Sequence, residues 1–132
     1  MTRILAAWFG LGLLLATLSC GNAAPSSISV SPQTADAQDF PNGQVQFTAL
    51  AHFHDPHQDL PMFTLTWCVG SADGRCNGNV ASVATVNGNG LAQCQPGLVG
   101  TATILAGIGP MKPVGDGGQQ LQLFGSARLT CP

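Results

Sequence analysis

The chain has 132 residues, a length that suits one domain of ordinary size. Charged residues make up only 8% of it, with four Lys and Arg against six Asp and a net charge of −2. So few cations cannot form a basic stripe, which argues against nucleic-acid binding. The 17 Gly and 9 Pro, together with the lack of Glu, indicate strands and turns rather than helices.

The N-terminal segment, residues 1–19, has the form of a secretory signal peptide. One positive charge at Arg3 precedes 15 apolar or small residues, from 4 to 18. A helix needs about 20 apolar residues to cross a bilayer, so this segment is too short for a comfortable membrane span. It therefore predicts that the chain is exported.

The end of this segment, Ser19-Cys20-Gly21, resembles a bacterial lipobox, in which a small residue precedes a Cys that receives diacylglycerol. The resemblance implies cleavage before Cys20 and a lipid anchor there, because two or three acyl chains hold a protein stably on a membrane. Residues 20–27 are then the lipidated Cys and a short tether. Gly rather than Asp after the Cys favours the outer membrane in a Gram-negative host. The alternative is ordinary signal-peptidase cleavage after Ala23 or Ala24.

The part of the chain that follows the tether begins with two predicted strands. Ile28 to Pro32 alternates and ends at a proline, which an edge strand tolerates. Gln33–Asn42 is polar and predicts a loop. Gln44–His54 predicts the clearest strand, because apolar and polar residues alternate along it. The residues of its core-facing side are Val45, Phe47, Ala49, Ala51 and Phe53.

The middle of the chain predicts one further strand between two loops. His54–Met62 contains two prolines and predicts a loop, and Gly70–Asn79 predicts another because it is rich in Gly, Asn and Asp. Phe63–Trp67 predicts the strand between them. Trp67 shares a face with Phe63 and Leu65, so we expect its indole in the core.

Residues 82–104 carry the strongest turn signals. Ser82–Val86 and Leu91–Cys94 predict short strands, and Asn87-Gly88-Asn89-Gly90 predicts a tight turn between them, since Asn and Gly accept positive φ. Gln95-Pro96-Gly97 ends the second strand. A third strand begins at Gly100, with alternate residues on its core side: Ala102, Ile104, Ala106 and Ile108.

The C-terminal part predicts a loop at Gly109–Gln119 and then a closing strand. The apolar residues that share one side of this strand are Leu121, Leu123, Ala127, Leu129 and Cys131. Together the segments predict an all-β fold of about seven strands.

Three separated pieces resemble the bacterial immunoglobulin-like domain of group 2, the module of intimin and invasin. They are Ser82-Val83-Ala84-Thr85-Val86, then Gly90-Leu91, then Gly100-Thr101-Ala102-Thr103-Ile104. Two upstream pieces support the resemblance: Ile28 to Pro32, and Gln44 to Ala51. The resemblance implies an immunoglobulin-like β-sandwich over residues 28–132, present here as a lone copy. It also implies a binding, adhesive or spacer role rather than catalysis.

Four cysteines remain when Cys20 is assigned to lipid: Cys68, Cys76, Cys94 and Cys131. In an exported chain they predict two disulfides, with three pairings open. We favour Cys68–Cys76 with Cys94–Cys131, and the alternative Cys68–Cys94 with Cys76–Cys131 stays open. No Cys-x2-Cys pair is present, which disfavours a four-cysteine metal site.

One cluster of metal-ligand residue types occurs, namely His52, His54, Asp55, His57 and Asp59, and the first four are the candidate metal ligands. His52 and His54 share the polar face of the predicted strand, about 7 Å apart. This spacing suits a bridged metal ion, completed by Asp55 or His57. The alternative is a polar strand end that runs into a solvated loop.

No reaction is indicated by the remaining polar residues, and we expect neither an enzyme nor a cofactor. Ser, His and Asp all occur, but a Gly-x-Ser-x-Gly elbow is missing. The sequence therefore favours an envelope module held on the membrane by its lipid, with a protein or glycan partner. The loops Gln33–Asn42, His54–Met62 and Gly109–Gln119 are its candidate binding elements. The alternatives are a small periplasmic metal-binding protein and a structural accessory subunit of an envelope assembly.

Overall fold

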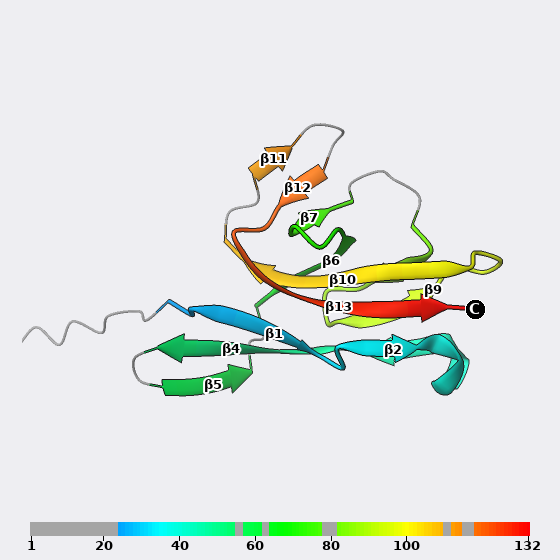
Figure 1. Cartoon of the computed structure of the whole chain (residues 1–132), viewed down its shortest axis with the longest axis horizontal. Helices are drawn as coiled ribbons and strands as arrows, with labels where there is room; N and C mark the ends of the chain where they lie inside the picture. The colour runs from blue at the N-terminus through cyan, green and yellow to red at the C-terminus, as the bar shows by residue number, and fades with distance from the viewer. Residues whose placement is uncertain (1–23, 55–56, 62–63, 78–81, 110–111, 115–117) are drawn as a thin grey trace, which may run out of the picture.

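The computed structural model describes residues 24–54, 57–61, 64–77, 82–109, 112–114 and 118–132 (Figure 1). Strands dominate this part of the chain, joined by two single 3-10 turns, η1 (Ala37–Asp39) and η2 (Pro41–Gly43). The predicted all-β class is therefore confirmed. The predicted signal peptide and Cys20 lie outside the described residues. Within the described ranges, no helix is long and apolar enough to cross a membrane.

Two three-stranded antiparallel sheets continue one another. The first has the order β1 (Ser27–Ser31), β4 (Thr48–His54), β5 (His57–Pro61). The second has the order β3 (Gln44–Gln46), β9 (Leu91–Cys94), β8 (Ala84–Val86). Only Phe47 separates β3 from β4, and its backbone N–H donates to Gly90 O at 2.9 Å. The predicted strand Gln44–His54 is thus split at Phe47, with one half in each sheet.

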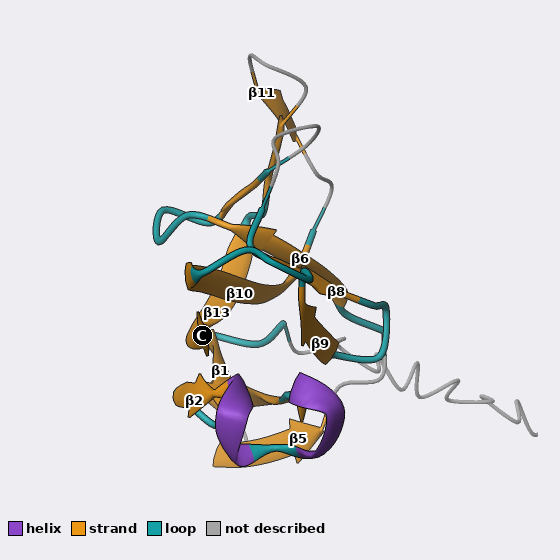
Figure 2. Ribbon diagram, turned by 90° about the vertical axis from the view of Figure 1, so that its right-hand side faces the viewer, coloured by secondary structure: helices purple, strands orange, loops and turns teal. Residues whose placement is uncertain are grey.

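The third sheet is larger. Its strands, in order, are β11 (Lys112–Val114), β12 (Gly118–Gln120), β7 (Arg75–Cys76), β6 (Thr66–Gly70), β10 (Gly100–Ile108), β13 (Leu123–Cys131) and β2 (Thr34–Asp36). Figure 2 shows its strands β6 and β10 on the other side of the molecule from β1 and β5. The longest pairing joins β10 to β13, from Gly100↔Cys131 to Ile108↔Leu123. All pairs are antiparallel except β2 with β13, which is parallel.

The core lies between these layers and follows the predicted alternation. Val45 of β3, Phe47 at the junction and Ala51 of β4 are wholly buried, whereas Leu50, just before Ala51, is 39% exposed. Ile104 and Leu129 are also wholly buried and face them from β10 and β13. Trp67 is only partly buried, and it packs against the edge of this core.

A second, smaller core covers the opposite face of β10, which the sequence pattern did not predict. Leu105 is wholly buried there with Cys76 and Leu121, and Cys68 and Phe124 pack against them. The short strands β7 and β12 provide this cover. A residue of β10 on either face can therefore be buried, so two-residue alternation alone underestimates the core.

Two of the predicted loops contain regular structure instead. Gln33–Asn42 contains β2, η1 and the start of η2. Two contacts hold this segment on the protein: Ala37 is 97% buried, and the N–H of Arg128 on β13 donates to Gln33 O at 2.8 Å. Gly109–Gln119 contains β11 and the start of β12, which pair with each other. Both segments gain strand structure from backbone pairing with a neighbour, which needs no apolar pattern.

The predicted loop His54–Met62 is also wrong over residues 57–61, which form β5. This strand pairs with β4 from His54↔His57 to Leu50↔Pro61. It is an edge strand whose described side chains are exposed, and edge positions tolerate both charge and proline. The strand predicted at Phe63–Trp67 begins later, at Thr66, and Phe63 lies outside the described residues.

Candidate functional site

His52 lies at the centre of a row of polar side chains that crosses the sheet β1-β4-β5. Its Nδ1 is 2.6 Å from Asp59 Oδ1, and its Nε2 is 2.8 Å from Ser29 Oγ. Asp59 stands directly opposite His52 on β5. Ser29 is its diagonal neighbour on β1, because Ser27 is the residue directly opposite. A diagonal pair is within reach of a long side chain, and the ring tip of His52 spans that gap.

The protonation of this row follows from its chemistry. An ionised carboxylate can only accept hydrogen bonds, so Nδ1 of His52 carries the hydrogen shared with Asp59. In the neutral ring Nε2 is then the acceptor, and the Ser29 hydroxyl donates to it. The side chains of His52 and Asp59 are 34% and 64% exposed, and Ser29 is half-buried. The row is thus ordered but open to solvent.

The predicted metal ligands are only partly brought together. His54 and His57 are register partners at the end of the β4–β5 hairpin, whereas Asp55 lies outside the described residues. His52 has both ring nitrogens occupied, so it would ligate a metal only by giving up Ser29 or Asp59. Over the described ranges, no group of three or more His, Cys, Asp or Glu residues is arranged to hold a metal ion.

A shallow hollow of about 310 Å³ lies beside the row. The residues that line it are Ser26, His52, Phe53, His54, Gln58 and Asp59. Ser26 fixes the backbone here, because its N–H and its hydroxyl donate to His52 O at 2.8 and 2.9 Å. A small molecule in this hollow would meet imidazole and carboxylate groups.

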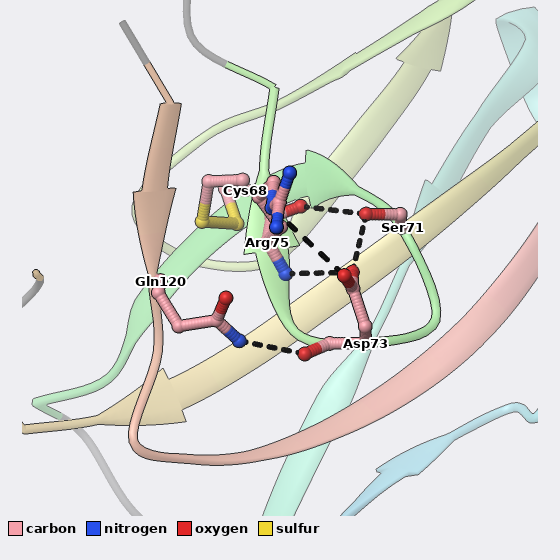
Figure 3. Close-up of a disulfide and its surroundings, with 6 residues drawn as sticks. Cys68, Ser71, Asp73, Arg75 and Gln120 are labelled. Atoms are coloured by element: carbon pink, nitrogen blue, oxygen red, sulfur yellow. Dashed lines mark hydrogen bonds and ion pairs between the residues drawn. A yellow bond between two sulfur atoms is a disulfide. The ribbon is translucent and has the colours of Figure 1, made fainter. Parts of the chain in front are cut away.

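The first disulfide joins Cys68 to Cys76 across the β6–β7 hairpin, as Figure 3 shows. Asp73 organises the turn of that hairpin: its Oδ1 accepts from the Ser71 hydroxyl at 2.6 Å and from the Arg75 N–H at 3.3 Å. The Ser71 hydrogen bond, with smaller contributions from Arg75, lowers the pKa of Asp73 below its usual 3.8. The Gln120 side chain donates to Asp73 O at 2.7 Å, which ties β12 to the turn.

The second disulfide joins Cys94 to Cys131, at the end of the molecule where β9 and β13 finish. Both bridges therefore match the pairing favoured from the sequence, and the alternative pairing is wrong. Cys131 is almost wholly buried, and it belongs to the main core. The bridge thus fixes the start of the turn at residues 95–97 to the last strand.

An apolar surface lies beside this second bridge, and we call it the far-end surface. Leu98 and Val99 are 44% and 73% exposed in the segment between β9 and β10. Leu98 lines a cleft of about 350 Å³ together with Phe40 and Pro96. The described residues that line this cleft include no charged side chain; the polar ones are Gln38, Asn42 and Gln95. Exposed apolar side chains beside a lining of this kind are chemically suited to contact with an uncharged, apolar group.

No protein-family model matches this chain, and no curated protein matches it in sequence. Its function is therefore inferred from its own residues and their geometry.

Sequence reasoning missed Ser29. It included Asp59 among the metal-ligand residue types but did not place it opposite His52, because it predicted no strand at residues 57–61. A two-residue connection after His54 puts His57 opposite it, and that register places residue 59 opposite residue 52. The signal that could have predicted this pairing is the short, two-residue connection between His54 and His57, which is typical of a hairpin. Ser29 could be found only from the register of β1 on β4, which no local pattern encodes.

Proposed function

We propose that residues 28–132 are an immunoglobulin-like β-sandwich of bacterial group 2, acting as a binding module of the cell envelope. The strand order supports this. The two small sheets follow the order of strands A, B, E and D of immunoglobulin domains. Strand β1 corresponds to A, β3 with β4 to B, β9 to E and β8 to D. Strands β6, β10 and β13 are neighbours in the order C, F and G. The three pieces of the resemblance fall on β8, at the start of β9 and on β10.

The observation that carries the binding role is the far-end surface. Val99 exposes 73% of an aliphatic side chain, next to a cleft whose described lining has no charged side chain. Burying such a side chain against a partner would gain roughly 1.5 kcal/mol or more. An apolar, uncharged surface fits a protein partner that presents an apolar side chain better than it fits an anionic glycan.

The position of this surface suits a tethered module. The chain enters β1 at one end of the molecule, and the far-end surface lies at the other end, near the C-terminus (Figure 1). A lipid on Cys20, followed by the short tether, would hold the first end at the membrane. The far-end surface would then point away from the membrane, toward partners in the periplasm or outside the cell.

The anchor is tested by the intact mass of the protein extracted from host membranes. We expect a chain that begins at Cys20 and carries two or three acyl groups. We also expect four further cysteines that react with a thiol reagent only after reduction. An unmodified chain that begins at Ala24 or Pro25 would overturn the lipid anchor and leave a freely diffusing protein.

The binding role is tested by photo-crosslinking in the host, with benzoyl-phenylalanine placed at Val99. We expect one discrete crosslinked protein, and we expect Leu98→Asp to remove it because a buried charge would face an apolar partner. Leu60 is the matched control position, since it is 46% exposed but lies on β5, away from the far-end surface. Equal crosslinking from both positions, or none from Val99, would contradict a partner at this surface.

A further inference from the structure

The row Ser29–His52–Asp59 has the connectivity that activates a serine hydroxyl. The carboxylate bonds to Nδ1 of the imidazole and the hydroxyl bonds to Nε2, at 2.6 and 2.8 Å. This order is that of a Ser-His-Asp triad, which is recognised by geometry and not by sequence position. We propose that Ser29 is a nucleophile that accepts acyl groups from small, accessible esters, with His52 as its general base and Asp59 as the positioning residue.

The three residues sit on a frame that holds their spacing. Strand β4 carries His52 and is paired on both sides, with β1 and with β5. The contacts of Ser26 to His52 O hold the start of β1 against β4 at this level. Ile28 and Val30, which flank Ser29, are 7% and 2% exposed and face the core. Their burial orients Ser29 toward the outer face of the sheet, where His52 and Asp59 lie.

The reaction that follows from this geometry is acyl transfer. The Ser29 hydroxyl gives its proton to Nε2 of His52, and Oγ forms a bond to the ester carbonyl carbon. The tetrahedral adduct then loses its alcohol, which takes the proton from His52, and the acyl group stays on Ser29. Water then attacks the carbonyl carbon of the acyl-serine while His52 takes its proton. The carboxylic acid leaves, and the proton returns from His52 to Oγ of Ser29. Asp59 stabilises the imidazolium that forms in each half-reaction without itself being protonated.

The surroundings define the class of substrate. Ser29 is half-buried, and the shallow hollow beside the row is lined by His52 and Asp59 but not by Ser29. The row offers no deep acyl pocket, so it suits a small acyl group or one displayed on a surface. Both donors of Ser26 already bind His52 O, so neither is free for an oxyanion. The rate then depends on the base and on the leaving group, which favours esters of acidic alcohols. General-base assistance of this kind is typically worth about 10²- to 10⁴-fold.

The test is labelling of the full exported chain with a fluorophosphonate probe, followed by peptide mapping. Oγ of the nucleophile bonds to phosphorus, fluoride leaves, and the hydroxyl proton passes through His52 to solvent. We expect the label on the peptide that contains Ser29, and none in Ser29→Ala. His52→Gln should slow labelling about 100-fold. Ser27→Ala is the matched control, because Ser27 is exposed and stands opposite His52 on β1, whereas Nε2 of the ring bonds to Ser29, and its labelling rate should not change.

Asp59 is tested by rescue of the labelling rate with the conservative variant, which a purely structural role would not show. Asp59→Asn removes the carboxylate that stabilises the imidazolium in the transition state, so labelling should slow, and Asp59→Glu, which keeps a carboxylate, should label faster than Asp59→Asn. Circular dichroism and thiol counts verify that each variant is folded with both disulfides. Labelling that survives Ser29→Ala, or that is unchanged in a folded His52→Gln, would overturn the proposal. So would absence of label on the folded wild-type chain. Crosslinking at Val99 is independent of every one of these outcomes.

Discussion

Replacing Cys94 and Cys131 together by Ala is expected to lower the free energy of unfolding by about 4 kcal/mol. The two residues are 37 apart in sequence, so their bridge closes a long loop and strongly restricts the unfolded chain. Cys131 is also almost wholly buried, and its loss leaves space in the main core. Urea denaturation, monitored by Trp fluorescence, measures this change. A loss of this size is a large part of the stability of a domain of this length.

The bridge Cys68–Cys76 provides the internal comparison. Its residues are only 8 apart, so its removal by double Ala substitution should cost about 2.5 kcal/mol. Cys76 belongs to the smaller core around Leu105, so any local loosening should be confined to the β6–β7 hairpin and its neighbour β12. A larger loss from this pair than from Cys94 and Cys131 would contradict the loop-entropy argument.

The sequence predicted well those elements whose pattern lies in a few consecutive residues. The alternation from Val45 to Ala51 carries its own face assignment, and the structure buries that face. The Asn87–Gly90 turn is equally local: Asn87 Oδ1 accepts from the N–H groups of Asn89 and Leu91, at 2.9 and 3.0 Å. The favoured cysteine pairing was also correct. Cys68 and Cys76 are close in sequence and lie on one hairpin, and the remaining pair, Cys94 and Cys131, joins the ends of β9 and β13.

The elements that sequence missed depend on a partner strand. Strand β2 consists of three residues and exists because β13 offers it a parallel edge. Strand β5 has no apolar face, and its backbone pairing with β4 defines it. Ser29, His52 and Asp59 lie on three strands, so their meeting requires two registers at once. A shift of one residue in either register would turn Ser29 or Asp59 to the other face of the sheet and break the row.

Substituting Gly90 by Ala is expected to lower the free energy of unfolding by about 3 kcal/mol. Gly90 has φ of +81°, a conformation that costs an L-residue roughly 1–2 kcal/mol. A Cβ at this position would lie 2.5 Å from Phe47 O and 2.9 Å from Cζ2 of Trp67. Gly90 O also accepts the N–H of Phe47, at the point where β3 passes into β4. The added methyl group must therefore displace the junction between the two small sheets.

Gly88 is the matched control because it lies in the same turn, two residues earlier. A Cβ there would meet nothing within 4 Å, and Gly88 is not among the glycines with positive φ. Ala at Gly88 should be neutral or stabilise by up to about 1 kcal/mol, since it restricts the unfolded chain without a clash. Urea denaturation of both variants measures the contrast, and Trp67 fluorescence should change only in Gly90→Ala. Equal stability of the two variants would show that the junction yields to a methyl group, and the close approach of Gly90 to Phe47 would then carry no structural role.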